Sequence, residues 1–203
     1  MLSTSALQAE ESFSYDGFYQ AKKIMYKAWS KKQETFYCGC HYDRKKRGNN
    51  IDRKSCGYLP KKENKSSNRI EAEHVVPYES MYRNLACSEI AKDKNINSKN
   101  LTLRQFCYKT DDTFRKFHDD PHNLVPSIGE LNQARSNYIY GDFEPQSEEY
   151  GGCNFEVDAK LREVYISDVI KGDVARIYGY VSKKYGYEMS DEENQKFRLW
   201  HVL

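Results

Sequence analysis

The chain has 203 residues, of which 38% are hydrophobic, 14% aromatic and 31% charged, and its formal net charge at pH 7 is +2. This length and aromatic content predict one globular domain and exclude a wholly disordered chain. Every long window contains charged residues, so the sequence predicts no membrane helix and no membrane partner.

The first segment is a run of small residues, Met1 to Ala9, without the charged and long apolar regions of a complete secretion signal. We therefore predict an N-terminal tail over residues 1–14, interpreted as a possible signal remnant, and one domain over residues 15–203.

The N-terminal half alternates helical and irregular patterns. Apolar residues at helical spacing after Asp16 predict an amphipathic helix over residues 17–31. Residues 41–69 carry ten Lys and Arg against three acids, with several turn residues, which indicates short strands joined by basic loops. Helices separated by loops fit residues 75–114 best.

The C-terminal half reverses the charge and then becomes helical. Residues 140–168 hold eight acids against two bases, and their Pro and Gly residues indicate a surface loop. An apolar stripe over residues 166–181 predicts a helix, and Ser190-x-x-Glu193 is a capping box that opens a last one. The predicted fold class is a single α+β domain with more helix than strand.

The six cysteines lack the C-x-x-C pairs of structural zinc sites, which favours disulfides and an oxidising compartment. If each cysteine pairs with one close to it in the sequence, two short-loop disulfides form and the two remaining cysteines make a third, distant pair. Sequence alone leaves the connectivity open. A zinc site built from Cys38, Cys40, Cys56 and a histidine is the alternative. The suggested pairs are Cys40 with Cys56, Cys87 with Cys107, and Cys38 with Cys153.

Glu73 and His74 place a carboxylate and an imidazole side by side, shortly before Pro77. Neighbouring residues on a strand point to opposite faces, so the two share a site only if the backbone turns there. Proline three residues later makes such a turn plausible. The non-catalytic alternative for a single Glu-His pair is a partly exposed salt bridge.

Phosphodiester hydrolysis needs a base for water and a divalent cation for the phosphate, and a neutral histidine suits the first task. The Glu73 carboxylate and the Asn123 amide suit Mg²⁺, which asks for few protein ligands. Arg104 can hold a phosphate bidentately. Asn123 lies near a predicted helix start that Ser127 and Glu130 would cap.

Several motifs occur in the order and approximate spacing of the bacterial endonuclease I family, and together they cover roughly residues 15–202. The chain therefore resembles these periplasmic or secreted, non-specific nucleases of the ββα-metal, or His-Me finger, type. The motifs are Tyr37-Cys38-Gly39-Cys40, Ser55-Cys56-Gly57-Tyr58, Glu73-His74-Val75-Val76-Pro77, His122-Asn123-Leu124, Gly129-Glu130, Asn132 with Arg135-Ser136-Asn137, and Gly141-Asp142-Phe143.

The resemblance implies a role for each matching residue. His74 would be the general base, Glu73 and Asn123 would hold one Mg²⁺, and Arg104, in an R-x-x-C motif, would stabilise phosphate. Mn²⁺ or Ca²⁺ can occupy such a site. The implied substrates are double- and single-stranded DNA and RNA, cut with little sequence specificity to 5′-phosphate and 3′-hydroxyl ends. An embedded ββα-metal finger, disulfide bonds, a periplasmic or secreted location and a monomer are expected.

Two departures from the family pattern stand out. Ala72 occupies the position of a tryptophan between two glutamates, so we expect looser packing there or filling by another aromatic. Members of the family also commonly continue past the position of Trp200 with a cysteine-containing tail, whereas this chain stops at Leu203. The sequence is accordingly a short variant or a trimmed form, and the tail's grip on DNA is expected to be missing.

Basic residues before the Glu-His pair are predicted to contact phosphates, with a solvated face as the alternative. Arg135 is a further candidate whose alternative role is structural, and His118 and His122 are predicted to be surface or packing residues. A different interpretation of the whole chain is a secreted, disulfide-bonded nucleic-acid-binding protein without catalysis. The predicted nucleic-acid-binding residues are Arg44, Lys45, Lys46, Arg47, Arg69 and Arg135.

Overall fold

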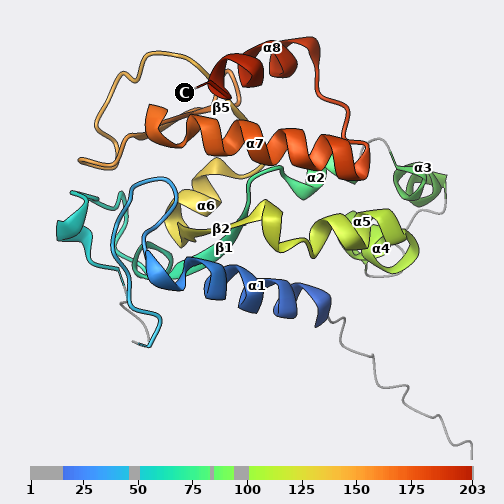
Figure 1. Ribbon diagram of the computed structural model, residues 1–203, viewed down its shortest axis with the longest axis horizontal. Coiled ribbons are helices and arrows are strands. Elements are labelled where there is room, and N and C mark those ends of the chain that lie inside the picture. Colours follow the sequence, from blue (N-terminus) through green and yellow to red (C-terminus); the bar gives the residue numbers. More distant parts are fainter. Residues whose placement is uncertain (1–15, 46–50, 83–84, 94–100, 203) are drawn as a thin grey trace, which may run out of the picture.

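A computed structural model describes residues 16–45, 51–82, 85–93 and 101–202 of the chain (Figure 1). Helices make up most of its regular structure, and short 3-10 turns connect several of them. The α-helices are α1 (Asp16–Ala28), α2 (Tyr78–Tyr82), α3 (Ala86–Asp93), α4 (Leu103–Thr110), α5 (Asp112–His118), α6 (Gly129–Arg135), α7 (Asp168–Tyr185) and α8 (Asp191–Trp200). The 3-10 turns are η1 (Trp29–Lys31), η2 (Arg53–Ser55), η3 (Ser66–Asn68) and η5 (Pro121–Asn123).

The strands form two small sheets. In the first, β1 and β2 run antiparallel, with His74 opposite Leu124. In the second, β5 lies between β3, to which it is parallel, and β4, to which it is antiparallel. The strands are β1 (Ile70–His74), β2 (Leu124–Ile128), β3 (Ile139–Tyr140), β4 (Phe155–Asp158) and β5 (Glu163–Ile166).

The predicted helices are confirmed. Helix α1 continues through η1 over the predicted range, and α2 to α5 occupy the region predicted as helices with loops. Helix α7 covers the apolar stripe from Val169 onward, although Val169 itself is exposed, and Ile166 belongs to strand β5 instead. Ser190 and Glu193 form both hydrogen bonds of a capping box at the start of α8. These elements follow from local patterns, because periodicity and capping involve residues three or four positions apart.

The prediction of short strands over residues 41–69 is wrong for the residues that the structure describes there. The segment consists of turns with isolated bridges, and strand β1 begins only at Ile70. The cause is local side-chain bonding, since the Asn64 amide oxygen accepts from the backbone N–H groups of Ser66 and Ser67, and Asp52 accepts from that of Lys54. Such bonds stabilise turns in place of a ladder.

The helix predicted to start at Ser127 is present, since α6 begins at Gly129, but the predicted cap is wrong. Strand β2 begins at Leu124 and is buried throughout, and α6 begins only at Gly129 without a side-chain cap. Glu130 instead accepts from the Tyr58 hydroxyl and from the backbone N–H of Lys62. Ser127 and Glu130 therefore do not cap α6, because Ser127 lies in a buried strand and Glu130 bonds to residues distant in the sequence.

The acidic stretch is a loop only in its first part. Residues 141–154 lack regular structure apart from turns, as predicted, but β4 and β5 follow and pair. Phe155, Val164 and Ile166 are buried there. Alternating apolar residues in these segments are typical of strands, but the many charged residues around them led us to predict a loop.

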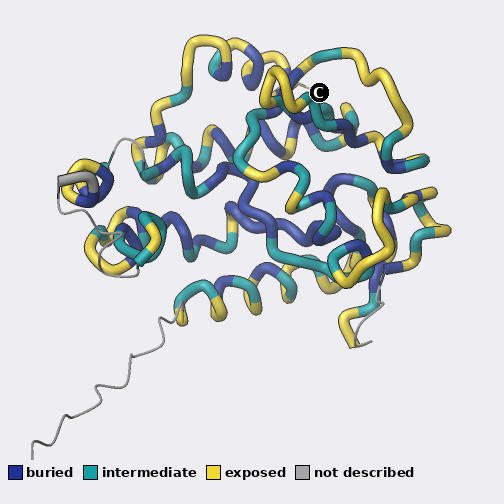
Figure 2. The backbone as a smooth tube through the Cα atoms, turned by 180° about the vertical axis from the view of Figure 1, so that it is seen from behind, coloured by how far each residue is buried: buried dark blue, intermediate teal, exposed yellow. Residues whose placement is uncertain are grey.

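The β1–β2 ribbon lies in the middle of the molecule, between α1 on one side and α7 on the other (Figure 1). Buried segments gather along this ribbon, while exposed residues follow the outer faces of the helices (Figure 2). Helix α6 follows β2 directly and packs on both strands, which gives a strand–strand–helix unit. Among the described residues no helix is long and apolar enough to cross a membrane.

All six cysteines form disulfides in the suggested pairing, Cys38–Cys153, Cys40–Cys56 and Cys87–Cys107. Gly39, at φ +66°, turns the backbone between the first two cysteines. Glycine adopts this left-handed conformation without steric strain. The flanking cysteines form disulfides with different segments, Cys38 with Cys153 and Cys40 with Cys56. The zinc alternative is wrong, because no thiolate remains to bind a metal.

Candidate functional site

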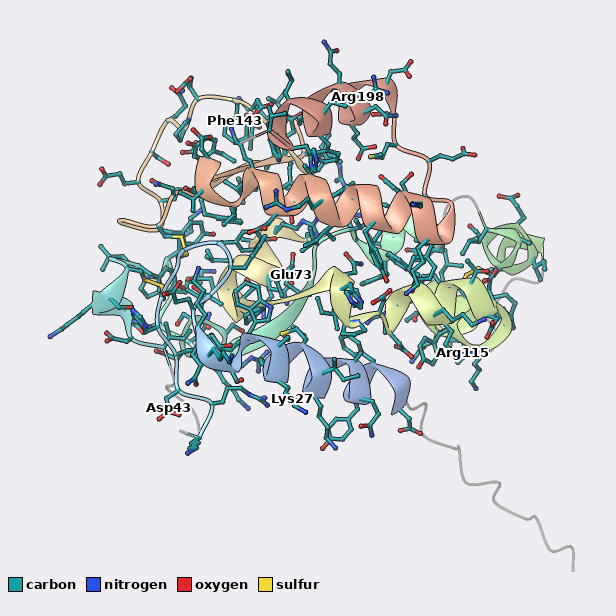
Figure 3. All side chains as sticks on the ribbon, in the orientation of Figure 1. Lys27, Asp43, Glu73, Arg115, Phe143 and Arg198 are labelled. Carbon is teal, nitrogen blue, oxygen red and sulfur yellow. A yellow bond between two sulfur atoms is a disulfide. The ribbon has the colours of Figure 1, made fainter. Side chains whose placement is uncertain are left out.

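A cavity of about 370 Å³ opens where β1 ends. Five elements contribute side chains that carry chemistry or shape it. They are Phe18 of α1, Glu73 and His74 of β1, Tyr78 of α2, Arg104 of α4 and Arg135 of α6. Glu73 lies near the centre of the molecule (Figure 3). The cavity therefore joins segments that are far apart in the sequence.

His74 is the last residue of β1 and is 8% exposed. Its Nε2 lies 2.8 Å from the backbone oxygen of His118, and because a carbonyl only accepts, the ring proton is assigned to Nε2. The lone pair is then on Nδ1. The ring stacks on Phe18 with 5.2 Å between centroids. Burial holds the pKa of His74 well below its usual range, so the imidazole is neutral at pH 7.

Glu73 lies beside His74 but points into a buried network. Its Oε1 accepts from the Tyr37 hydroxyl at 3.0 Å and from Arg135 Nη1 at 3.3 Å. Burial raises the pKa of Glu73 to about 7, although Arg135 and the Tyr37 bond act to lower it. Neither described bond uses Oε2.

Arg135 is 1% exposed and holds the backbone turn that follows β1. Nη1 donates to the oxygen of His74 at 2.9 Å, and Nη2 donates to that of Val75 at 2.6 Å. These bonds explain how Glu73 and His74, neighbours on a strand, both reach the cavity, because the chain bends at Val75 and Val76. This is the structural role that we weighed for Arg135; its direct contact with nucleic acid stays a prediction.

Asn123 fixes the other side of the same turn. Its Oδ1 accepts from the N–H of Val76 at 2.8 Å, and its Nδ2 donates to the Val76 oxygen at 3.0 Å. The side chain is fully buried and does not line the cavity. Because an amide oxygen has two lone pairs, one remains beyond the Val76 bond. The predicted metal-binding role of Asn123 stays a prediction.

Arg104 reaches the cavity from the first turn of α4. Its Nε donates to His118 Nε2 at 3.0 Å, and its guanidinium carbon lies 4.1 Å from the ring centroid of Tyr78. His118 Nδ1 in turn lies 2.7 Å from an Asp119 carboxylate oxygen. The carboxylate accepts the proton of Nδ1, so Nε2 carries the lone pair that Arg104 meets.

His118 is the main residue that the sequence analysis missed. It is fully buried, as expected of a packing histidine, but its ring lies 5.1 Å from that of His74 and it positions Arg104. One signal was available, because Phe114 and His118 are four residues apart and so share a face of α5. That spacing indicated an inward position, not a partner.

Apart from the buried Arg135, the predicted basic residues divide into three groups. Arg44 and Lys45 are exposed, and Arg69 forms an ion pair with Glu71. Lys46 and Arg47 lie outside the described residues.

Within the described part of the chain, no group of three or more His, Cys, Asp or Glu side chains is arranged to hold a metal ion. The donor set still fits Mg²⁺, which retains several waters and needs only one or two protein oxygens. Glu73 supplies a hard oxygen at the cavity, and Asn123 supplies another on the adjoining turn.

The sequence matches the endonuclease I family over residues 8–201. The chain belongs to the endonuclease I family. This confirms the resemblance found in the motifs, and the match extends over both sheets and the helices that surround the cavity.

Several curated relatives show the same relationship. An "Extracellular deoxyribonuclease" of Aeromonas hydrophila is 36% identical over 90% of this chain and 76% of its own length. A "Periplasmic deoxyribonuclease" of the same organism is 33% identical over 98% of this chain and 78% of its own length. An "Endonuclease-1" of Buchnera aphidicola is 34% identical over 93% and 70%, respectively. This endonuclease I family member thus aligns with most of each relative.

Proposed function

We propose that the protein is a metal-dependent endonuclease that hydrolyses phosphodiester bonds of DNA and RNA with little sequence specificity. The observation that carries this proposal is the state of His74, a neutral imidazole in a cavity with its Nε2 proton committed to a carbonyl. Nδ1 is then ready to accept a proton at neutral pH. Membership of the endonuclease I family and the deoxyribonuclease names of its relatives support the same substrate class.

In the proposed reaction, His74 Nδ1 takes a proton from water as the water oxygen bonds to phosphorus. The bond between phosphorus and the 3′ oxygen breaks, and the leaving 3′ oxygen takes a proton from solvent water, which gives a 5′-phosphate and a 3′-hydroxyl. Arg104 offers N–H donors and a positive charge to the phosphate while His118 and Tyr78 hold its guanidinium. Phe18 restrains the imidazole by stacking.

Glu73 and Asn123 are the residues proposed to hold Mg²⁺ or a similar divalent ion. When bound, the ion neutralises charge on the phosphate and on the leaving oxygen. The unit of β1, β2 and α6 carries or adjoins these residues, and we assign it as a ββα-metal finger. Tyr37 and Arg135 orient the Glu73 carboxylate.

The proposed location is the periplasm or the medium. Three disulfides persist in oxidising compartments, and relatives are named extracellular or periplasmic deoxyribonucleases. We propose that the protein acts as a monomer on double- and single-stranded substrates. Its low sequence specificity would follow from contacts to phosphates, because such contacts carry no sequence information.

The test is cleavage of supercoiled plasmid by the oxidised protein in Mg²⁺ or in EDTA. We expect cleavage only with Mg²⁺, and we expect His74→Ala to lower the rate about 10²- to 10⁴-fold while DNA binding persists, because the general base is lost. His41→Ala is the matched control, since His41 is exposed and lies outside the cavity. Products should accept a 5′ label from polynucleotide kinase only after phosphatase treatment.

The competing function is nucleic-acid binding without catalysis. It requires binding that survives EDTA, no strand scission in Mg²⁺, and no effect of His74→Ala. Such a set of results would replace the nuclease proposal.

A further inference from the structure

A second cleft, of about 500 Å³, adjoins the catalytic cavity. The two share three lining residues, Phe18, Ala72 and Asn132, so they lie next to each other at Ala72. The side chain at this position is only a methyl group. Phe18 and Tyr26 of α1 pack against the same small hydrophobic cluster as Ala72.

Cations on aromatic faces characterise this second cleft, which we call the α1 groove. Lys22 Nζ lies 4.9 Å from the Phe18 ring centroid, and Lys23 Nζ lies 4.3 Å from that of Tyr19. The Arg44 guanidinium carbon lies 3.6 Å from the centre of the Tyr26 ring. The α1 groove is lined by the three shared residues together with Tyr19, Lys22, Lys23, Tyr26, Arg44, Arg69, Ile70 and Glu71.

The charge of the α1 groove is unbalanced. Four cations line it, against the single carboxylate of Glu71, whose oxygens accept from Arg69 and Asn132. Lys22, Lys23 and Arg44 form no ion pair with a described carboxylate, whereas cations on other faces, such as Arg53 and Lys184, do. Three unneutralised cations beside the cavity favour a polyanion that continues out of it.

We propose that the α1 groove binds the nucleic-acid strand that flanks the scissile bond, with backbone phosphates at Lys22 and Lys23 and an unpaired base against an aromatic ring of α1. The proposal rests on the nuclease function proposed above. It adds Lys22, Lys23 and Tyr19 to the substrate site, none of which the motifs indicated. A basic track beside aromatic rings is the usual design for single strands, because every base can stack.

The groove predicts that substrate length affects binding. A strand of about four nucleotides is expected to occupy the cavity alone, whereas one of about sixteen should also reach the α1 groove. The double variant Lys22→Ala/Lys23→Ala should therefore bind the longer strand about tenfold more weakly and the shorter one almost normally. It should also reduce the slope of log affinity against log salt by about 1.4, which is two lost phosphate contacts on a single strand.

The measurement is fluorescence anisotropy of labelled oligonucleotides of both lengths, in EDTA, over a salt series. The matched control is Lys27→Ala/Lys31→Ala, which removes the same charge from α1 and η1 outside the groove; Lys27 is labelled in Figure 3. EDTA separates this test from catalysis, so a protein that binds but never cuts would refute the nuclease and leave the groove testable.

Equal affinities and salt slopes for the two double variants would overturn the proposal, as would equal losses on both strand lengths. A wild-type protein that fails to bind the longer strand at low salt would overturn it as well. Helical circular dichroism of both variants checks that they are folded.

Discussion

At the scale of single residues, the cavity depends on how two histidines divide their tasks. His74 Nε2–H donates a hydrogen bond to the backbone oxygen of His118, and His118 Nδ1–H donates one to the Asp119 carboxylate. The first histidine thereby exposes a lone pair to the cavity, and the second directs one to Arg104. Burial lowers the pKa of His118, so this acceptor stays neutral near pH 7.

Replacing His118 should impair catalysis through Arg104. His118→Ala removes the acceptor of a hydrogen bond from a charged donor, a contact that contributes about 1.5 to 3 kcal/mol, so kcat/KM for plasmid cleavage should fall about 10- to 100-fold. His118→Gln, which keeps a side-chain acceptor, should restore part of the activity. His122→Ala is the control, because that side chain is 70% exposed and lies outside the cavity. Wild-type rates in His118→Ala would contradict the positioning role.

At the scale of elements, Asp120 joins α7 to the turn that begins β2. Its carboxylate is 3% exposed and accepts from three side chains of α7, Tyr180 at 2.7 Å, Lys184 at 2.8 Å and Tyr185 at 2.6 Å. It also accepts from the backbone N–H of His122 in η5. Burial alone would raise the pKa of Asp120, but these bonds hold it well below its usual range.

A lowered pKa in the folded state makes stability depend on pH in one direction. The ionised Asp120 carboxylate contributes to the free energy of unfolding above about pH 3.9, which is the pKa of an aspartate in the unfolded chain. This contribution is lost as the pH falls towards the pKa of Asp120 in the folded protein. Asp120→Asn should therefore lower the free energy of unfolding by about 2 kcal/mol at pH 7 and much less in strong acid.

Urea denaturation at both pH values measures this difference. Asp173→Asn, on the helix α7 that Asp120 contacts, is the control, since Asp173 forms an ion pair with Arg176 on an exposed face and its replacement should change little. A loss in Asp120→Asn that is the same at both pH values would contradict the linkage.

At the scale of the whole molecule, the disulfides connect segments that are separate in the sequence. Cys38–Cys153 links the segment after α1 to the second sheet, across 115 residues of chain. Cys87–Cys107 links α3 to α4, the helix that holds Arg104, across 20 residues. By loss of chain entropy in the unfolded state, such bonds stabilise by about 5 and about 3 kcal/mol, respectively.

Opening the second bond should affect both stability and activity. Cys87→Ser/Cys107→Ser should lose about 3 kcal/mol of unfolding free energy and cleave plasmid more slowly, because α4 is less firmly held. Full reduction by dithiothreitol should abolish cleavage, which would keep the enzyme inactive in a reducing cytoplasm. Urea titrations and plasmid assays measure the two effects, and full activity with all thiols free would reject this account.

Sequence patterns predicted more of the helices than of the sheets. Helix α8 was predictable because Ser190 and Glu193 bond within one turn. Strand β5 was not predicted, because its pairing with β3 and β4 joins segments whose charged surroundings suggested a loop. Likewise, Ser127 carried a capping pattern, but burial in β2 overrode it.

The amino-acid sequence alone determined the family, the main helices and the adjacency of Glu73 and His74, because each depends on near neighbours or on motif order. It suggested the short-loop cysteine pairing but left the connectivity open. Only the tertiary structure decided which nitrogen of His74 faces the cavity, that His118 holds Arg104, and that the α1 groove lies next to the cavity at Ala72. Those features depend on burial and on contacts between residues from separate elements. Hydrogen-bond partners and desolvation, which set proton positions and pKa values, exist only once the chain has folded.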